Sequence, residues 1–217
     1  MGAMTREVKG RPYDTTGRRE ASSMTRQRII DGARSLMLTR GYRAATVAEI
    51  ARQAGVNTDT VYELVGRKAE IVRELIEQAI SGTDHAVQAE ERAHVIAIHA
   101  EPDPARKLAI YARATRATQE RLAPLFLVLR EAAATETAAA DVWNEIAERR
   151  ATNMRKLAAE IQAAGGLRDG LTVDEAADVI WATNGPELYV LLTGDRGWPP
   201  ERFERWLAET WRRLLLP

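Results

Sequence analysis

Cysteine is absent from this 217-residue chain, and histidine occurs only three times, as His85, His94 and His99. The absence of thiols excludes disulfide bridges, thiolate metal sites and cysteine nucleophiles. The longest apolar stretch, Leu122–Leu129, has eight residues, whereas roughly 20 are needed to cross a bilayer. The amino terminus also has no apolar secretory segment, so we expect a cytoplasmic protein.

Sequence motifs typical of enzymes are missing as well. The chain has no glycine-rich phosphate loop, no pair of histidines at a metal-binding helical spacing and no Gly-x-Ser-x-Gly elbow. Adjacent acids do occur, but helix capping explains Asp174 and Glu175. We therefore predict no catalytic centre, no cofactor and no metal site, and we do not expect an enzyme.

The charged residues are divided unevenly along the chain. Basic and acidic residues balance at 31 each, and hydrophobic residues make up 45% of the sequence, which is typical of a folded globular protein. Through Lys68, however, 13 basic residues stand against seven acidic ones. A basic first third joined to an acidic remainder favours a region that binds a polyanion, with chance variation of the surface as the alternative.

The first third predicts an arm followed by three helices. Residues 1–21 are polar and contain glycine and proline, so they are expected to form a flexible basic arm. Apolar spacing predicts a helix over about 24–40, ended by Gly41. The capping-box pattern Thr46–Glu49 begins a short second helix, and Asn57 or Thr58 caps a third that Gly66 ends. A supporting helix followed by two short helices and a tight turn is a helix-turn-helix arrangement.

The remainder, 69–217, predicts a larger body of five or six helices and no strands. Breaks are expected at 81–84, 101–104, near Pro124, at 165–166 and at 194–200. A second capping box, Thr172–Glu175, opens a predicted helix of about 20 residues, which Pro186 should kink. The fold class is therefore all-α, with a three-helix helix-turn-helix head (22–68) and a larger helical body (69–217).

The first third resembles the amino-terminal domain of TetR-type transcriptional regulators. The resemblance spans about 45 residues in unbroken order, and a looser one covers Trp181–Tyr189, Gly197–Pro199 and Trp206 with Leu207. The segments that carry the first resemblance are Thr25–Ala33, Arg40–Ala51, Ala54–Val56, Thr60–Tyr62 and Lys68. The family implies an all-α protein with a head that reads DNA and a body that binds a small molecule and dimerises.

The resemblance assigns phosphate contacts to Lys68 and Tyr62, and it gives Thr46 a phosphate-facing position besides its capping role. Arg26 and Arg43 are candidates for further phosphate contacts, because cations beside phosphates supply most of the affinity for DNA. An ordinary solvated lysine and a purely core tyrosine are the alternatives for Lys68 and Tyr62.

Base contacts are expected from the polar start of the third helix, at Asn57, Thr58 and Thr60. Asparagine can pair with adenine through two hydrogen bonds, and threonine can offer a hydroxyl or contact a thymine methyl. Helix capping alone is the alternative for Asn57. The arm, with Arg18 and Arg19, is a candidate for a neighbouring minor groove, and whether it contacts DNA is left open.

Most small-molecule sites are apolar cavities in which a few polar groups orient the ligand. The body offers aromatic, thioether and polar candidates for such a lining: Tyr111, Trp143, Met154, Trp181, Asn184 and Glu187. A packed core with a few polar surface groups is the alternative for each of them. A buried Glu187 would favour a cationic ligand, but the sequence does not identify the effector.

The last helices contain more apolar residues than a solvated surface requires, so we predict a four-helix dimer interface there. Its candidate residues are Leu188, Leu191, Leu192, Phe203, Trp206 and Trp211. The leading hypothesis is a homodimeric repressor that binds a near-palindromic operator and is released by a small-molecule effector. The alternative is an all-helical small-molecule binding protein or enzyme that does not bind specific DNA sequences.

Overall fold

The computed structural model describes residues 15–217, and every regular element in that range is helical. This confirms the predicted all-α fold. The elements in chain order are α1 (Thr15–Ala44), α2 (Val47–Ala54), α3 (Thr58–Leu64), α4 (Lys68–Ser81), η1 (Ala89–Glu91), α5 (Ala93–Ala100), α6 (Pro104–Ala133), α7 (Thr137–Ala163), α8 (Val173–Thr183), α9 (Pro186–Val190), η2 (Leu191–Asp195) and α10 (Pro200–Leu215).

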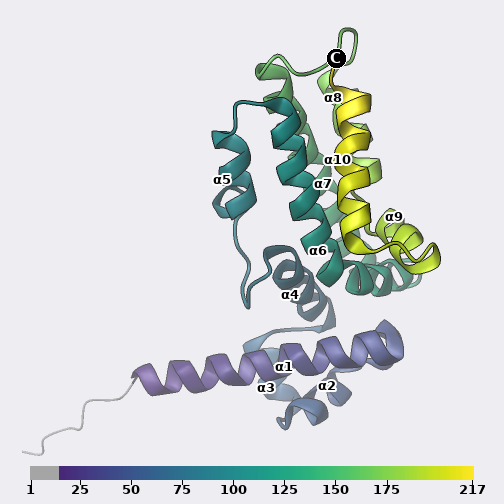
Figure 1. Cartoon of the computed structure of the whole chain (residues 1–217). Helices are drawn as coiled ribbons and strands as arrows, with labels where there is room; N and C mark the ends of the chain where they lie inside the picture. The colour runs from purple at the N-terminus through teal and green to yellow at the C-terminus, as the bar shows by residue number, and fades with distance from the viewer. Residues whose placement is uncertain (1–14) are drawn as a thin grey trace, which may run out of the picture.

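Helices α1, α2 and α3 form a small head below an upright bundle made of the later helices (Figure 1). The Thr46 hydroxyl accepts a hydrogen bond from the backbone nitrogen of Glu49 at 3.2 Å and begins α2. Gly55, with φ 67°, ends that helix in the left-handed conformation that glycine adopts without strain. Asn57 then caps α3, so the predicted helix-turn-helix arrangement is present.

The first helix is longer than the sequence pattern predicted. It begins at Thr15 rather than near residue 24, so the predicted arm does not extend through 15–21, which are helical. The rest of the arm, 1–14, lies outside the described residues. The regular helix is interrupted at Gly41, where φ is 79° and ψ is 168°, which agrees with the predicted end of the helix.

Two predictions about prolines in the body were wrong. Helix α6 runs without a break through Pro124, because this proline is exposed and water can reach the carbonyl that it leaves without a donor. The helix predicted from 173 does not extend for about 20 residues with a kink. It ends at Thr183, and Pro186 begins the separate helix α9 as its first residue, the position in which proline needs no helical donor.

The second capping box is confirmed. The Thr172 hydroxyl accepts a hydrogen bond from the Glu175 backbone nitrogen, and the Glu175 carboxylate accepts one from the Thr172 backbone nitrogen at 2.9 Å. Hydrogen bonds from the Thr172 backbone and hydroxyl lower the pKa of Glu175. At α2 the box is only half formed, since the Glu49 carboxylate accepts from Arg52 at 2.5 Å.

Buried apolar side chains form two clusters. The lower cluster joins the head and α4 to parts of α6 and α7, and it includes Ile50, Leu75 and Phe126. The upper cluster joins α5, the rest of α6 and α7, and the helices from α8 to α10, with Leu108 and Trp211 among its members. None of the helices between residues 15 and 217 is both long and apolar enough to cross a bilayer.

Helix α4 connects the head to the body through polar contacts at both sides. Toward α1, Arg26 pairs with Glu74 at 2.9 Å. Toward α7, Arg73 pairs with Glu145 at 2.6 Å, and Arg149 pairs with Glu77. Helix α4 is therefore bonded both to the head and to the body.

Candidate nucleic-acid interface and ligand cavity

The head presents an open hollow between α2, α3 and the start of α4. Val47, Tyr62, Gly66, Arg67, Lys68 and Glu70 line it. Tyr62 is 51% exposed, so its ring is not a core residue, and its hydroxyl is accessible from solvent. The structure therefore brings Tyr62 and Lys68, the two predicted phosphate contacts from different helices, to one concave surface.

Lys68 occupies the first position of α4, and its Nζ lies 3.7 Å from the centroid of the Tyr42 ring. The buried ring face holds the ammonium by a cation–π interaction. Burial lowers the pKa of Lys68, nearby Glu136 opposes that effect, and Arg43 adds to it. Burial also raises the pKa of Tyr42 to about 12. The lysine is thus held in one place with a cationic neighbour and faces the hollow.

A carboxylate already caps the amino terminus of α4. The Glu70 carboxylate accepts a hydrogen bond from the backbone nitrogen of Arg67 at 2.7 Å. The Arg67 amide is therefore not free to bind an anion, whereas the side chains of Tyr62 and Lys68 line the hollow.

The start of α3 combines capping with exposed polar groups. The Asn57 Oδ1 accepts hydrogen bonds from the backbone nitrogen and the hydroxyl of Thr60, both at 2.7 Å. Asn57 and Thr60 therefore hold each other at the helix start, and Thr58 beside them is exposed. Of the predicted base-reading residues, the Asn57 amide nitrogen and the Thr58 side chain remain directed to solvent or to a partner.

The two arginines predicted as phosphate contacts differ. Arg43 is exposed and lies near Lys68, whose pKa it affects. Arg26 is half-buried and donates to Glu74 at 2.9 Å, a hydrogen bond that raises the pKa of the guanidinium and lowers that of the carboxyl. Its charge is neutralised within the protein, so Arg26 is better explained as a link between α1 and α4. Sequence spacing gave no sign of this pairing across 48 residues.

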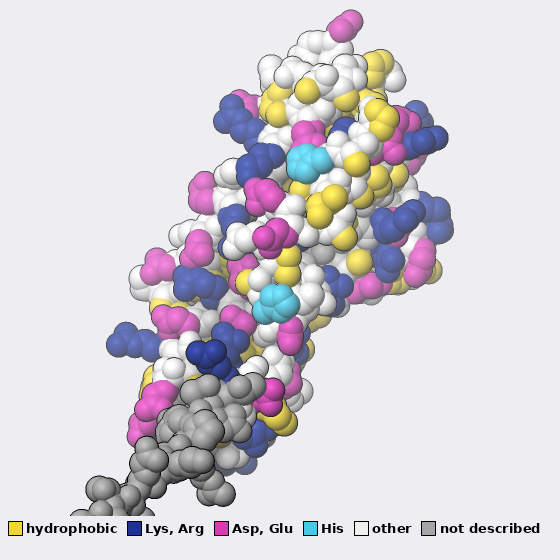
Figure 2. Space-filling model, turned by 90° about the vertical axis from the view of Figure 1, so that its left-hand side faces the viewer, with side chains coloured by type: hydrophobic (Ala, Val, Ile, Leu, Met, Phe, Trp, Pro, Cys, Tyr) yellow, Lys and Arg dark blue, Asp and Glu magenta, His cyan; other side chains and the backbone are white. Residues whose placement is uncertain are grey.

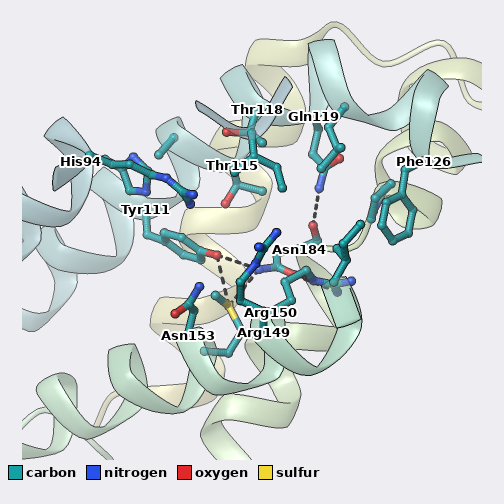
Figure 3. A pocket seen from close by; sticks show the side chains of 17 residues that line it. His94, Tyr111, Thr115, Thr118, Gln119, Phe126, Arg149, Arg150, Asn153 and Asn184 are labelled. Carbon is teal, nitrogen blue, oxygen red and sulfur yellow. Dashed lines mark hydrogen bonds between the residues drawn. The ribbon is translucent and has the colours of Figure 1, made fainter. Parts of the chain in front are cut away.

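The body contains a partly open cavity of about 110 Å³ where the two apolar clusters meet. Figure 3 shows side chains from several helices directed into it, with Tyr111 and Asn184 joined at its centre. The Asn184 amide nitrogen donates to the Tyr111 hydroxyl at 2.8 Å, and that hydroxyl donates to the Met154 sulfur at 3.1 Å. Three predicted ligand residues, Tyr111, Met154 and Asn184, thus line one cavity.

The other three predicted ligand residues lie elsewhere. Trp143 packs against Phe126 in the lower cluster, with ring centroids 4.5 Å apart. Trp181 is 39% exposed on the outer side of α8. Glu187 is not enclosed, because it pairs with Arg130 at 3.4 Å near the surface. Helical periodicity identifies apolar faces but does not tell a cavity wall from a filled core, and this limit explains the three errors.

The sequence prediction missed most of the polar lining of the cavity. Arg92, His94, Gln119, Arg149, Arg150 and Asn153 all contribute to it. Burial lowers the pKa of His94, and Arg92 lowers it further. Long polar side chains are usually exposed, so the sequence carried no signal that these would turn inward.

The predicted dimer residues separate into two groups. Phe203 and Trp211 are fully buried in the upper cluster, and the Trp211 indole donates to the Thr183 hydroxyl at 2.7 Å. Both belong to the core of the protomer, and their assignment to a dimer contact was wrong. Leu191 is 50% exposed, and the partly exposed side chains beside it are Leu188, Leu192 and Trp206.

One side of the molecule, which Figure 2 shows as a space-filling surface, has acidic and basic side chains intermixed over the body. Exposed charged side chains of the body also form ion pairs, such as Lys156 with Glu90 at 2.9 Å and Arg155 with Asp174 at 3.0 Å. Exposed pairs of this kind contribute little to stability. They leave that side of the body without a strong charge of one sign.

The comparison with protein families agrees with this geometry. Residues 29–75 match the family described as bacterial regulatory proteins, tetR family. The amino-terminal part of the chain is similar to this family. The matched range contains the residues from α1 to α4 that form the hollow, and the resemblance predicted from the sequence is confirmed.

Curated relatives align with the same part of the chain. The HTH-type transcriptional regulator TtgR of Pseudomonas putida is 34% identical over 73 residues, which cover 34% of this chain and 35% of TtgR. The uncharacterized HTH-type transcriptional regulator YvkB of Bacillus subtilis is 39% identical over 54 residues, or 25% of this chain and 29% of YvkB. These alignments span about a third of the relatives' length. The relatives are named as regulators and not as enzymes, as the sequence predicted.

Solved structures extend the similarity of fold to the body. NalD of Pseudomonas aeruginosa, described as the secondary repressor of the MexAB-OprM multidrug efflux pump, has a TM-score of 0.69 at 23% identity, over 91% of this chain and 98% of NalD. A putative transcriptional regulator from Saccharomonospora viridis in complex with choline has a TM-score of 0.67 at 20% identity, over 90% and 99% of the two chains. This similarity shows that both the head and the body, over about nine-tenths of the chain, have the fold of these proteins.

Proposed function

We propose that this protein is a ligand-responsive transcriptional repressor that binds double-stranded operator DNA as a homodimer in the cytoplasm. The observation that carries the proposal is the hollow of the tetR-family head, where Tyr62 and Lys68 face the same side as the exposed start of α3. Cations and hydroxyls beside short polar side chains are what a reader of DNA requires. The similarity of fold to NalD, which is described as a repressor, supports repression.

Within this proposal, 22–68 act as the DNA-binding domain and 69–217 as the ligand-binding and dimerisation domain. In each protomer α3 enters a major groove, Thr58 and the Asn57 amide contact base edges, and Lys68, Tyr62 and Arg43 contact phosphates. Thr46 lies at the start of α2 and faces the same backbone. The partly exposed apolar residues near α9 and α10 supply the dimer contact, and two heads meet successive major grooves about 34 Å apart on a near-palindromic site.

The cavity supplies the regulatory site of the proposal. Ile80, near the carboxyl end of α4, lines the cavity, and Lys68 begins the same helix at the hollow of the head. A ligand that displaces Ile80 would shift α4 and with it the separation of the two heads. Structural neighbours described as complexes with choline and, for FadR from Bacillus subtilis, with stearoyl-CoA support a small-molecule effector in the body.

A gel-shift titration with the DNA that flanks the protein's own gene tests this function. We expect the wild type to retard that DNA and the variants Lys68→Ala and Tyr62→Ala each to bind it at least about tenfold more weakly, the loss expected for a charged or hydroxyl contact worth about 1.4 kcal/mol. Arg106→Ala is the matched control, because Arg106 is an exposed arginine at the start of α6 in the body.

Circular dichroism would establish that each variant keeps its helical content. Unchanged mobility of every DNA tested with the folded wild type would contradict the proposal. That result would instead favour an all-helical small-molecule binding protein whose head does not read DNA.

A further inference from the structure

The charged side chains that line the cavity are all basic. Among its 17 lining residues are Arg92, Arg149 and Arg150, and no aspartate or glutamate. The acid that sequence reasoning associated with a ligand, Glu187, lies outside the cavity in an ion pair with Arg130. The lining therefore opposes a cation and favours an anion.

Two of these arginines have no carboxylate partner among residues 15–217. Arg149 is neutralised by Glu77 of α4. Arg150, in contrast, donates only to neutral oxygens, which are the Asn184 Oδ1 at 3.1 and 3.2 Å and the Trp181 carbonyl at 2.6 Å. Its guanidinium also lies 4.6 Å from the centroid of the Trp181 ring, so it is fixed in position.

Arg92, the residue that precedes α5, is in the same situation. Its guanidinium donates twice to the Val87 carbonyl, at 3.0 and 3.2 Å, and no carboxylate of the described residues forms an ion pair with it. Burial lowers the pKa of both Arg92 and Arg150, and the carboxylates of Glu77 and Glu90 near Arg92 and of Glu187 near Arg150 oppose that effect only in part. A partly buried cation that forms no ion pair is costly, and a bound anion would reduce that cost.

A third group in the cavity lacks a partner. The Gln119 side chain is only 4% exposed, and its Nε2 donates to the Asn184 carbonyl at 2.6 Å. Its Oε1 is buried without a hydrogen-bond partner, although buried polar atoms are nearly always paired. This oxygen can only accept, so it requires a hydroxyl or N–H donor that the described residues do not provide.

Another part of the lining is apolar. Ile80, Leu122, Phe126 and Ile146 come from the lower cluster and form a wall without charge. The volume of about 110 Å³ is far larger than the roughly 10–15 Å³ that one water needs. An adjoining cavity of about 120 Å³ shares Arg92, His94, Tyr111, Asn153 and Met154, and Glu90, Lys156 and Glu160 line its other part, so the anion is placed in the first cavity. An inorganic anion would satisfy the arginines but leave this apolar wall unfilled.

We infer that the cavity binds a small organic acid with one carboxylate, an apolar ring or short chain, and a hydrogen-bond donor distant from the carboxylate. The carboxylate binds Arg150 and Arg92, the apolar part packs on Phe126 and Leu122, and the donor reaches the Gln119 Oε1. This inference names the ligand class of the regulatory site in the proposed function and rests on that function for its biological role.

Isothermal titration calorimetry with the purified full-length protein tests the inference. The anionic probes are 4-hydroxybenzoate, 3-phenylpropionate and hexanoate, and the comparison probes are benzyltrimethylammonium, benzyl alcohol and sodium phosphate. We expect at least one organic acid to bind at least tenfold more tightly than all three comparison probes. Tighter binding of the cation, equal binding of the neutral alcohol, or binding of phosphate alone would overturn the inference.

Two substitutions locate the site. Arg150→Gln and Arg92→Gln keep a hydrogen-bonding side chain without the charge, and each should weaken the best acid at least tenfold. Arg155→Gln is the matched control, since Arg155 lies on the same helix as Arg150 but pairs with Asp174 outside the cavity. If neither cavity variant changes the affinity while both remain folded, the acid binds elsewhere and the inference is wrong.

This titration contains no DNA, so its failure is separate from failure of the proposed function. If an organic acid binds but the protein retards no DNA, the inferred ligand class is kept and the proposed regulatory function is contradicted. If the protein retards DNA but binds none of the acids, the inferred ligand class is contradicted and the proposed regulatory function is kept.

Discussion

The head and the cavity both use cations, but in opposite surroundings. Arg43 is exposed on the head, and Lys68 lies beside it at an open hollow. Arg92 and Arg150 are partly buried in the body and are oriented by carbonyl and amide oxygens. Exposed cations suit a polyanion that contacts many of them at once, whereas partly buried cations at a cavity suit one small anion. The same side-chain chemistry therefore serves two different ligands in one chain.

Ionic strength should separate these two uses most strongly. If each head contacts phosphate through three or four cations, raising salt from about 50 to 200 mM should weaken operator binding about a thousandfold or more, because bound phosphates release counterions. The affinity for an organic acid in the cavity should change by less than about tenfold, since enclosed charges are screened much less. Fluorescence anisotropy and calorimetry over the same salt series measure the two. Equal salt dependence of the affinities for operator DNA and for the organic acid would contradict this distinction between head and cavity.

The two tryptophans of α10 test the corrected dimer assignment. Trp211 is fully buried, so Trp211→Ala should lower the free energy of unfolding by about 3–5 kcal/mol. Trp206 is only partly buried, so Trp206→Ala should lower it by less and should instead weaken self-association. Urea denaturation at one protein concentration, combined with sedimentation, distinguishes the two effects. A larger loss of stability from Trp206→Ala would show that the core has been assigned incorrectly.

The two capping threonines allow a smaller test of head against body. Thr172→Ala removes a reciprocal capping box and should cost about 1 kcal/mol or more, whereas Thr46→Ala removes one bond and should cost less. The pKa of Glu175 is lowered in the folded protein, so the contribution of the Thr172 box is present above the usual glutamate pKa and is lost as pH falls through the lowered value. Thermal unfolding of both variants at neutral and acidic pH measures the two losses of stability. Thr172→Ala should cost more at neutral pH, and the two losses should become similar in acid.

The smallest effect is expected from the exposed ion pair between α4 and α7. Glu145→Gln breaks its contact with Arg73 and should change stability by less than about 1 kcal/mol. If α4 transmits the effect of the ligand, the same variant should reduce the factor by which an acid weakens DNA binding, while each affinity measured alone stays near the wild-type value. Arg155→Gln, which leaves α4 untouched, is the control. An unchanged factor would show that this contact takes no part in the coupling.

The fold and the head could be predicted from the sequence because they depend on local signals. The Thr46 and Asn57 caps, the glycines that end helices and the spacing of apolar residues all act within a few positions of one another. The cavity depends on contacts between distant segments, such as Gln119 with Asn184 and Arg150 with Trp181. Periodicity places a residue on a helix face but does not show whether a cavity lies beside it. The predicted ligand site therefore included Trp143 and Glu187 and omitted Arg92 and Arg150.

The central claim is that α4 joins an anion-binding cavity to a DNA-binding head. The most direct test measures operator affinity with and without a saturating organic acid, and acid affinity with and without saturating operator. Linkage requires the two factors to be equal, and we predict that each ligand weakens the other by the same factor of about fivefold or more. Two ligands that bind tightly and independently of one another would contradict the account.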